Sequence, residues 1–329
     1  MLFRSEADLS LRQADDRLQI EIDAVLFERA AHDVEHFGIG PERGRVGTGR
    51  ARFALREIGG LGLATTDLVN ARAIMEGSKK TFELLTTGPN DTPLVVQIFG
   101  ADAKEMTGAA QFLEARGASA VDINMGCPVR KVVRTGGGSA MMCDTSGATV
   151  ELIRKIVEAV KIPVTVKMRL GWDANTHTAP YFAREFEQAG VKAVAIHGRT
   201  RAQGFSGSVD RSGIRQVVEA VDRIPVIGNG DVTEPQHALE RMRQTGCAGV
   251  MIGRGALRTP WLFRQAWHQI RTGEPLPEPS FNEKCRAILR HLDLLDRHVP
   301  AAQAVDCMRK RISWYGKTMG HIKPLKEAV

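Results

Sequence analysis

The sequence predicts an α/β protein with a (β/α)8 TIM barrel and a C-terminal helical domain. From Pro93 onward, short β-branched apolar runs alternate with longer amphipathic runs, the pattern of repeated β/α units. The runs Ile162-Pro163-Val164 and Ile224-Pro225-Val226 repeat at 225 − 163 = 62 residues, or two units of 31. Near-continuous apolar strands, each followed by a helix, favour a parallel sheet that closes into a barrel.

The barrel elements can be located in chain order by these runs. Strands are expected at 93–99, 120–124, 163–168, 193–197, 225–228 and 249–252. Helices are expected around 104–115, 148–160, 179–188, 212–221, 235–244 and 260–270. A doubly wound open sheet would show the same alternation and is the structural alternative.

The two ends of the chain depart from this pattern. Residues 1–51 form an atypical N-terminal segment in which no first barrel strand is recognisable, and the barrel is predicted over 52–272. A Pro- and Gly-rich linker then leads into a helical tail at 280–329, where residues 281–329 hold ten Lys/Arg against five Asp/Glu. Such a tail could hold a phosphate backbone, but a solvated helical surface would explain the charge equally well.

Composition excludes several classes of protein. The 329 residues are 43% hydrophobic and 25% charged, which is ordinary for a globular chain. No stretch approaches the ~20 apolar residues of a membrane span, and charges run through the amino terminus, so a soluble cytoplasmic protein is expected. Five scattered cysteines without a Cys-x-x-Cys pair indicate neither a disulfide framework nor a metal site.

Polar residues recur where the predicted strands end. In barrels of this type, functional groups lie at the carboxyl ends of the strands and in the loops that follow. Recurring buried polar groups are costly unless they are paired or used, so core packing explains them poorly. The candidates are Gln97, Asn124, Cys127, Lys167, His197, Arg199, Asn229, Gly230, Asp231, Gly253 and Arg254.

Cys127 is the candidate catalytic residue. It follows a strand in a Gly-Cys-Pro turn, ahead of a basic, Gly-rich loop at 129–138. An ordinary thiol is mostly protonated at neutral pH and can act as a general acid, whereas Arg130, Lys131 and Arg134 would favour the thiolate. The alternative is a buried, small apolar residue, the interpretation that we give to Cys247.

Lys167 and His197 are expected at the mouth of the barrel. The Lys167 ammonium could stabilise an electron-rich ring or an enolate-like oxygen, although a lysine that extends to solvent is the simpler interpretation. His197 alone would more often be a structural histidine. The glycine-rich turns around Gly230 and Gly253 suit close approach of a phosphate-bearing cofactor, with Arg254 as the cation.

At these residues the chain resembles the tRNA-dihydrouridine synthase family, most closely its bacterial, nitrogen-regulation-like (B-type) branch. The resemblance covers about 53–326, in order and at the expected spacing. Its runs are 96–100 (VQIFG), 122–128 (DINMGCP), 166–172 (VKMRLGW), 197–201 (HGRTR) with Gln203, 227–231 (IGNGD), 251–254 (MIGR) with Pro260-Trp261, and Arg309-Lys310 with Ser313-Trp314-Tyr315.

The resemblance implies a function and a role for each candidate. Family members bind FMN at the barrel mouth, are reduced by NADPH, and pass hydride to C6 of a uracil ring in tRNA while a cysteine protonates C5. Cys127 would be that acid and Asn124 would belong to its loop, close to the substrate. Gln97 and Lys167 would contact the flavin ring, and His197 and Arg199 would lie between flavin and uracil. The flavin phosphate would be held by Asn229, Gly230, Asp231, Gly253 and Arg254.

The basic tail, with Arg309, Lys310, Arg311 and Lys317, would then bind the tRNA backbone. The family's first strand carries a Pro-Met-Ala turn, but no such run precedes Arg52, so residues 1–51 are either divergent or out of frame. We also expect a tail shorter than is usual in the family. Two other functions stay open: an FMN barrel acting on a free dihydropyrimidine, and a tRNA-binding relic without flavin.

Overall fold

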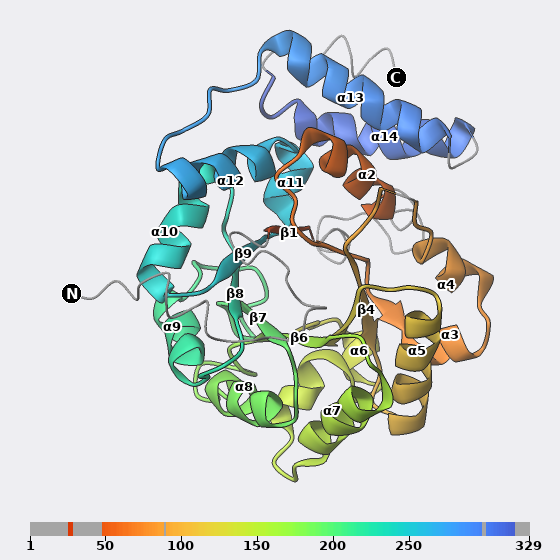
Figure 1. Cartoon of the computed structure of the whole chain (residues 1–329), viewed down its shortest axis with the longest axis vertical. Helices are drawn as coiled ribbons and strands as arrows, with labels where there is room; N and C mark the ends of the chain where they lie inside the picture. Colours follow the sequence, from red (N-terminus) through yellow and green to blue (C-terminus); the bar gives the residue numbers. More distant parts are fainter. Residues whose placement is uncertain (1–25, 29–47, 89, 298–300, 320–329) are drawn as a thin grey trace.

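The computed structural model describes residues 26–28, 48–88, 90–297 and 301–319, which form a TIM-barrel-like α/β fold (Figure 1). All neighbouring strands are parallel, in the order β1-β9-β8-β7-β6-β5-β4-β2, with β3 also paired to β4. From β4 to β9 the strands are neighbours in chain order, so the doubly wound alternative is wrong. The strands are β1 (Leu26–Glu28), β2 (Ala64–Thr65), β3 (Val69–Asn70), β4 (Leu94–Phe99), β5 (Ala120–Met125), β6 (Val164–Arg169), β7 (Ala193–His197), β8 (Val226–Asn229) and β9 (Gly249–Ile252).

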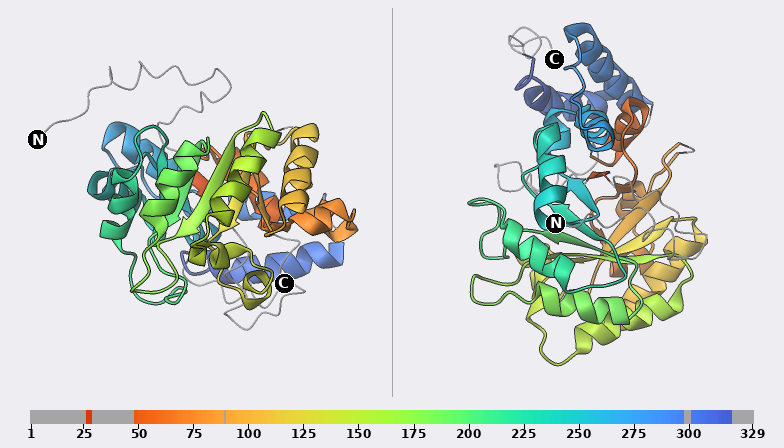
Figure 2. Two further views of the ribbon diagram at one scale, coloured as in Figure 1. Left: turned by 90° about the horizontal axis from the view of Figure 1, so that it is seen from below. Right: turned by 60° about the vertical axis from the view of Figure 1, so that its left-hand side comes forward.

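Helices surround the strands and cover the outer face of the sheet (Figures 1 and 2). Their apolar faces pack on outward-facing strand residues such as Ile123, Val166 and Ile196 in one large core. The helices are α2 (Thr48–Ile58), α3 (Ala71–Met75), α4 (Lys79–Leu84), α5 (Ala103–Ala115), α6 (Arg130–Val133), the 3-10 helix η2 (Gly138–Cys143), α7 (Ala148–Ala159), α8 (Ala179–Gln188), α9 (Arg211–Glu219), α10 (Pro235–Thr245), α11 (Arg254–Arg258), α12 (Leu262–Thr272), α13 (Phe281–Asp296) and α14 (Ala301–Tyr315).

Strand β1 lies in the segment where the sequence showed no first strand. It pairs with β9 and also contacts β2, so the two ends of the strand order meet. A run of three residues is too short for strand alternation to be recognised in a sequence. The remaining residues of 1–47 lie outside the described part of the chain.

Strands β2 and β3 together act as one interrupted strand beside β4. Thr65 is paired with Val95, and Val69 is paired with Ile98. Val69 lies four residues after Thr65, whereas Ile98 lies only three residues after Val95. One extra residue of this kind is a bulge, which bends the strand locally. The Thr66 hydroxyl, within the interruption, accepts a hydrogen bond from the Gln97 N–H (3.1 Å) and so ties the bulge to β4.

Side chains inside the barrel form an apolar layer and a polar layer. Because strand residues alternate between faces, positions two apart point inward together. The apolar layer comprises Leu63, Val95, Ala120, Ala195, Ile227 and Met251. The next inward positions toward the carboxyl ends carry Gln97, Asp122, Asn124 and Lys167, all buried. The fold therefore places the polar groups next to the barrel mouth.

Helices α13 and α14 pack against each other over a separate small core and lie against α2 and α11 (Figures 1 and 2). A capping box between Ser280 and Glu283 starts α13. Helix α12 ends at Thr272 and α13 begins at Phe281, whereas α2 runs across the boundary predicted at residue 52. The division into barrel and tRNA-binding tail stays a prediction. Among the described residues, no helix is long and apolar enough to cross a membrane.

Candidate active site

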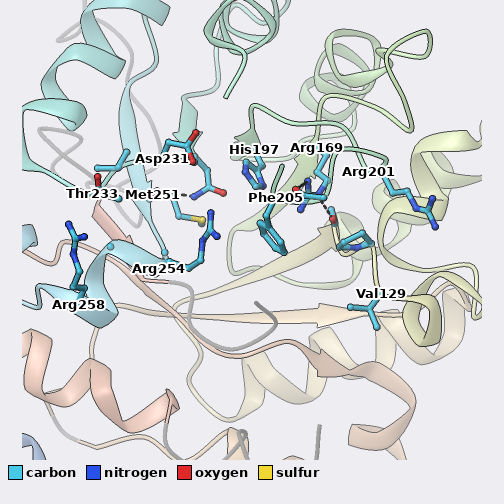
Figure 3. Close-up of a pocket in the computed structure, with 18 of the residues that line it drawn as sticks. Val129, Arg169, His197, Arg201, Phe205, Asp231, Thr233, Met251, Arg254 and Arg258 are labelled. Atoms are coloured by element: carbon cyan, nitrogen blue, oxygen red, sulfur yellow. Dashed lines mark hydrogen bonds between the residues drawn. The ribbon is translucent and has the colours of Figure 1, made fainter. Parts of the chain in front are cut away.

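A cavity of about 750 Å³ opens at the carboxyl ends of the barrel strands. Its wall is formed by the ends of β6 to β9, the loops after β5 and β7, helix α11 and the end of α14. This is the position at which TIM-barrel enzymes carry their active sites. Figure 3 shows Arg258 and Arg201 toward opposite ends, with Arg254 and Phe205 between them.

Positive charge dominates the cavity wall. Asp231 is the one acidic residue among the described residues that line it. The lining cations are Arg130, Arg169, Arg201, Arg254, Arg258 and Lys317. Such a site attracts anionic ligands, because low-dielectric walls concentrate the field of like charges.

Cys127 lies behind this wall and is completely buried. Its side chain packs with Leu68 and Val132, while its neighbours Gly126 and Pro128 line the cavity. The Asn124 carboxamide oxygen accepts hydrogen bonds from the N–H groups of Gly126 (3.2 Å) and Cys127 (2.9 Å). Asn124 therefore fixes the turn that carries the thiol.

A chain of buried hydrogen bonds holds Asn124 in turn. The Asn124 amide donates to Gln97 Oε1 (2.8 Å), and the Gln97 amide donates to Asp122 Oδ2 (2.6 Å). The other Asp122 oxygen accepts from the Thr165 hydroxyl (2.6 Å) on β6. Lys167 pairs with Asn124 in the strand register and is 1% exposed. Three adjacent strands thus support the turn at Cys127 through satisfied polar groups.

Arg169 ties the same turn to the opposite side of the cavity. Its guanidinium donates to the carbonyl oxygens of Gly126 (2.9 Å), Thr200 (3.0 Å) and Gly204 (2.7 Å). It also lies 5.4 Å from the Phe205 ring centroid, and Arg254 lies 4.9 Å from that ring. Phe205 is therefore held between two cations in the centre of the cavity (Figure 3).

Arg199 and Asp231 form a two-point ion pair beside His197. The Arg199 guanidinium donates to both Asp231 oxygens (3.0 and 2.8 Å) and to the carbonyls of Ser206 (3.1 Å) and Gly207 (2.5 Å). Burial would raise the pKa of Asp231, but hydrogen bonding and charge from Arg199 outweigh it and hold that pKa below its usual value. Asp231 is thus an anion at neutral pH that is already neutralised by protein.

His197 faces this pair from the end of β7. Its Nε2 lies 3.4 Å from Arg199 Nη1, and because a guanidinium can only donate, this contact is a hydrogen bond in the tautomer that carries its proton on Nδ1. A Cβ at Gly230 would lie 2.9 Å from His197 Cδ2 and 2.6 Å from Val209 Cγ2. Only glycine therefore fits the turn that packs against the imidazole.

The sequence-predicted residues fall into two groups. One group lines the cavity: His197, Asn229, Gly230, Asp231, Gly253 and Arg254. The other group is buried behind it: Gln97, Asn124, Cys127, Lys167 and Arg199. For the second group, direct contact with cofactor or substrate stays a prediction. Cys247 is 3% exposed, which confirms its interpretation as a small buried residue.

Sequence reasoning did not assign several residues that line the cavity. Arg169 and Arg201 stand in the motif runs quoted above, so the signal for them was present. Phe205 and Arg258 lie outside those runs, and nothing local indicates that they face the site. Of the basic tail, Lys317 lines the cavity, whereas Arg311 is 8% exposed and packs inside rather than on the surface. The side chain of Lys310 lies outside the described part of the chain.

Comparison with known proteins decides the family. Residues 46–329 match the family model described as dihydrouridine synthase (Dus). The chain belongs to the dihydrouridine synthase family. A probable tRNA-dihydrouridine synthase from Rickettsia bellii (strain RML369-C) is 38% identical over 271 residues, 82% of each chain. The tRNA-dihydrouridine synthase B of Xanthomonas axonopodis pv. citri (strain 306) is 38% identical over 78% of this chain and 77% of its own.

Solved structures support the fold of this family member. Morphinone reductase, as its N189A mutant, superposes with a TM-score of 0.50 at 12% identity, over 78% of this chain and 89% of that one. This likeness concerns the fold alone. No group of His, Cys, Asp and Glu suited to a metal ion occurs among the described residues.

Proposed function

We propose that this chain is a tRNA-dihydrouridine synthase, which uses FMN to reduce the C5–C6 bond of a uridine in tRNA at the expense of NADPH. The carrying observation is the cationic cavity, lined by six basic side chains and one acid that Arg199 neutralises. Membership of the dihydrouridine synthase family supports the same conclusion.

The residues at the cavity fit a flavin mononucleotide. A volume of about 750 Å³ lies within the range of cofactor sites. The ends of β8 and β9 are joined by a hydrogen bond from the Asn229 amide to the Met251 carbonyl (2.9 Å). Gly230 and Gly255 have no room for a Cβ, and Arg254 provides a cation beside them. These two turns would hold the phosphate, through backbone N–H groups and Arg254.

When bound, FMN would supply hydride to C6 of the uracil ring after reduction by NADPH. The thiol of Cys127 would donate the proton to C5, and Asn124 would keep that thiol in place. The ammonium of Lys167, in the polar layer of the barrel, would offset negative charge near the ring. Because Cys127 is buried, a uracil ring can reach it only if the Pro128 side of the wall moves.

A folded tRNA must present its uridine unstacked to reach such a cavity. The lining cations that are not assigned to the flavin phosphate or to backbone carbonyls, Arg130, Arg201, Arg258 and Lys317, would then bind the phosphates around the extruded nucleotide. This requirement favours tRNA over a free dihydropyrimidine, which would carry no phosphates for these cations to bind.

The test is turnover by the purified chain with unmodified tRNA and NADPH. The visible spectrum, with mass identification of released cofactor, is expected to show bound FMN, and nucleoside mass spectrometry is expected to show dihydrouridine.

Cys127→Ala should keep the flavin and lose at least 99% of turnover, whereas Cys285→Ala on α13 should keep both. Full activity of Cys127→Ala would remove the thiol from the mechanism. Activity on a free dihydropyrimidine alone, or tRNA binding by a colourless protein, would support the two alternatives instead.

A further inference from the structure

The end of α14 forms part of the active-site wall. Trp314 and Lys317 line the cavity together with Arg254 and Arg258, and α14 contacts α11, the helix that bears those two arginines. About sixty residues of chain separate Lys317 from these two arginines, so the helical pair contributes directly to a site built on the barrel.

Trp314 is held in a fixed orientation. The residue after it, Tyr315, is buried in the core between α13 and α14, and its hydroxyl lies 2.8 Å from Nδ1 of the buried His291. Ile312, one turn earlier, packs in the same core. Since consecutive helical residues point about 100° apart, burial of Tyr315 directs Trp314 away from that core. The indole keeps partial exposure at the cavity.

Lys317 adds a cation to this ring. Its ammonium lies 4.4 Å from the centroid of Trp314, and its N–H bonds the Trp314 carbonyl (3.1 Å) as the helix ends. A rigid aromatic surface with a cation beside it suits a nucleotide, because any base can stack on the ring while the cation binds the phosphate.

The other tryptophan–cation pairs differ in one respect. Trp172 lies against Arg201 (4.3 Å), Trp261 against Lys284 (5.1 Å) and Trp267 against Arg271 (5.3 Å), but none of these three indoles lines the cavity. Of the four tryptophans, all within the described residues, Trp314 is the one at the site. Trp267 and Arg271, on α12, therefore provide a matched control.

We propose that Trp314 stacks on the base of an unpaired tRNA nucleotide next to the reduced uridine, and that Lys317 binds the phosphate of that nucleotide. This inference rests on the proposed function. It assigns the end of α14 a specific contact with one nucleotide, rather than a general attraction to the tRNA backbone. Stacking is insensitive to base identity, so the contact would fix the position of the RNA without reading its sequence.

The experiment measures steady-state kinetics on unmodified tRNA and equilibrium tRNA binding without NADPH. Trp314→Ala and Trp314→Leu should raise KM and Kd about tenfold or more, with kcat changed less than about twofold, whereas Trp314→Phe should keep most of the affinity. Lys317→Ala should lower the slope of log Kd against log salt by about 0.7. Trp267→Phe and Arg271→Ala should leave all of these values unchanged, and thermal unfolding confirms that each variant is folded.

The outcomes separate the two levels of the proposal. If Trp314→Leu binds tRNA as tightly as the wild type while the wild type makes dihydrouridine, the stacking contact is wrong and the proposed function stands. A loss confined to kcat would also overturn it, because a positioning contact acts on binding. If the wild type binds tRNA but reduces no uridine, the proposed function fails, and the effect of Trp314→Leu on binding still tests the contact.

Discussion

At the scale of single residues, Asp231 has a side chain that stabilises its turn, while the backbone of that turn is expected to bind the ligand. A carboxylate would repel a phosphate, yet Asp231 stands in the turn that is proposed to hold one. Its side chain is committed to Arg199 and to the Val209 N–H (3.1 Å), and its backbone has a positive φ of 52° next to Gly230 at 111°. Left-handed residues of this kind turn backbone N–H groups toward an anion. We therefore expect the backbone of this turn, rather than the Asp231 carboxylate, to meet the cofactor.

Gly230→Ala tests this turn. The variant combines a positive φ with a Cβ only 2.6 Å from Val209 Cγ2, so it should lower the free energy of unfolding by roughly 2–5 kcal/mol and displace His197. Denaturant unfolding and the flavin content per chain measure the two effects. Gly117→Ala is the control, because Gly117 also has a positive φ of 79° but nothing lies near its Cβ. It should cost about 1 kcal/mol and leave flavin binding unchanged. Equal changes in unfolding free energy and in flavin content in the two variants would show that the close packing around Gly230 affects neither stability nor cofactor binding.

At the scale of secondary structure, the regular barrel units were predictable because their signal is local. Strand β7 (Ala193–His197) and helix α8 (Ala179–Gln188) have the bounds expected from their apolar patterns. The two-residue strands β2 and β3 were not found, since each is too short to show alternation and is held by pairing with β4.

The candidate site was predictable where it depends on strand ends. His197, Asn229 and Arg254 follow strands that the sequence located, and the rule for barrels places them at the mouth. Trp314 and Phe205 reach the same cavity through the packing of α14 and the path of a loop, neither of which is encoded in a local pattern. Arg311 was misjudged for a related reason. Its place in a basic tail indicated a side chain that binds tRNA, but the residue is buried beside His291.

The α13–α14 pair should respond to acid through His291. Burial first, and then the charge of Arg311, lower its pKa from 6.5 to about 3. Between these values the unfolded chain binds a proton that the folded chain does not, so the stabilisation is complete above about pH 6.5 and declines as the pH falls toward 3.

Unfolding free energies of wild type and His291→Gln at several pH values measure this effect. The advantage of the wild type should be constant above pH 6.5 and shrink progressively below it. A wild-type advantage that grows on acidification would reverse the sign and disprove the assignment.

At the scale of the whole molecule, cations from distant parts of the chain converge on one cavity. Arg130 comes from the start of α6, Arg201 from the loop after β7, Arg254 and Arg258 from α11, and Lys317 from the turn just after α14. The net charge of +7 is modest for 329 residues, so the arrangement of charge matters more than its total. A large polyanion can contact several of these groups at once, whereas a free pyrimidine cannot.

Salt dependence of tRNA binding tests this arrangement. If about four of the cations displace counterions from phosphates, raising salt from about 50 to 200 mM should weaken binding roughly 100-fold. Arg258→Gln should reduce the slope of log Kd against log salt by about one contact, or 0.7–0.9, and Arg271→Gln on the outer helix α12 should not. Within the described part of the chain, Arg258 is paired with the partly exposed Glu234 (3.2 Å), so its loss should leave the fold intact. The thermal unfolding temperature of each variant checks that point.

A slope near zero in the wild type would mean that phosphate contacts do not hold the RNA, and the cationic cavity would then suit a small anionic substrate rather than tRNA.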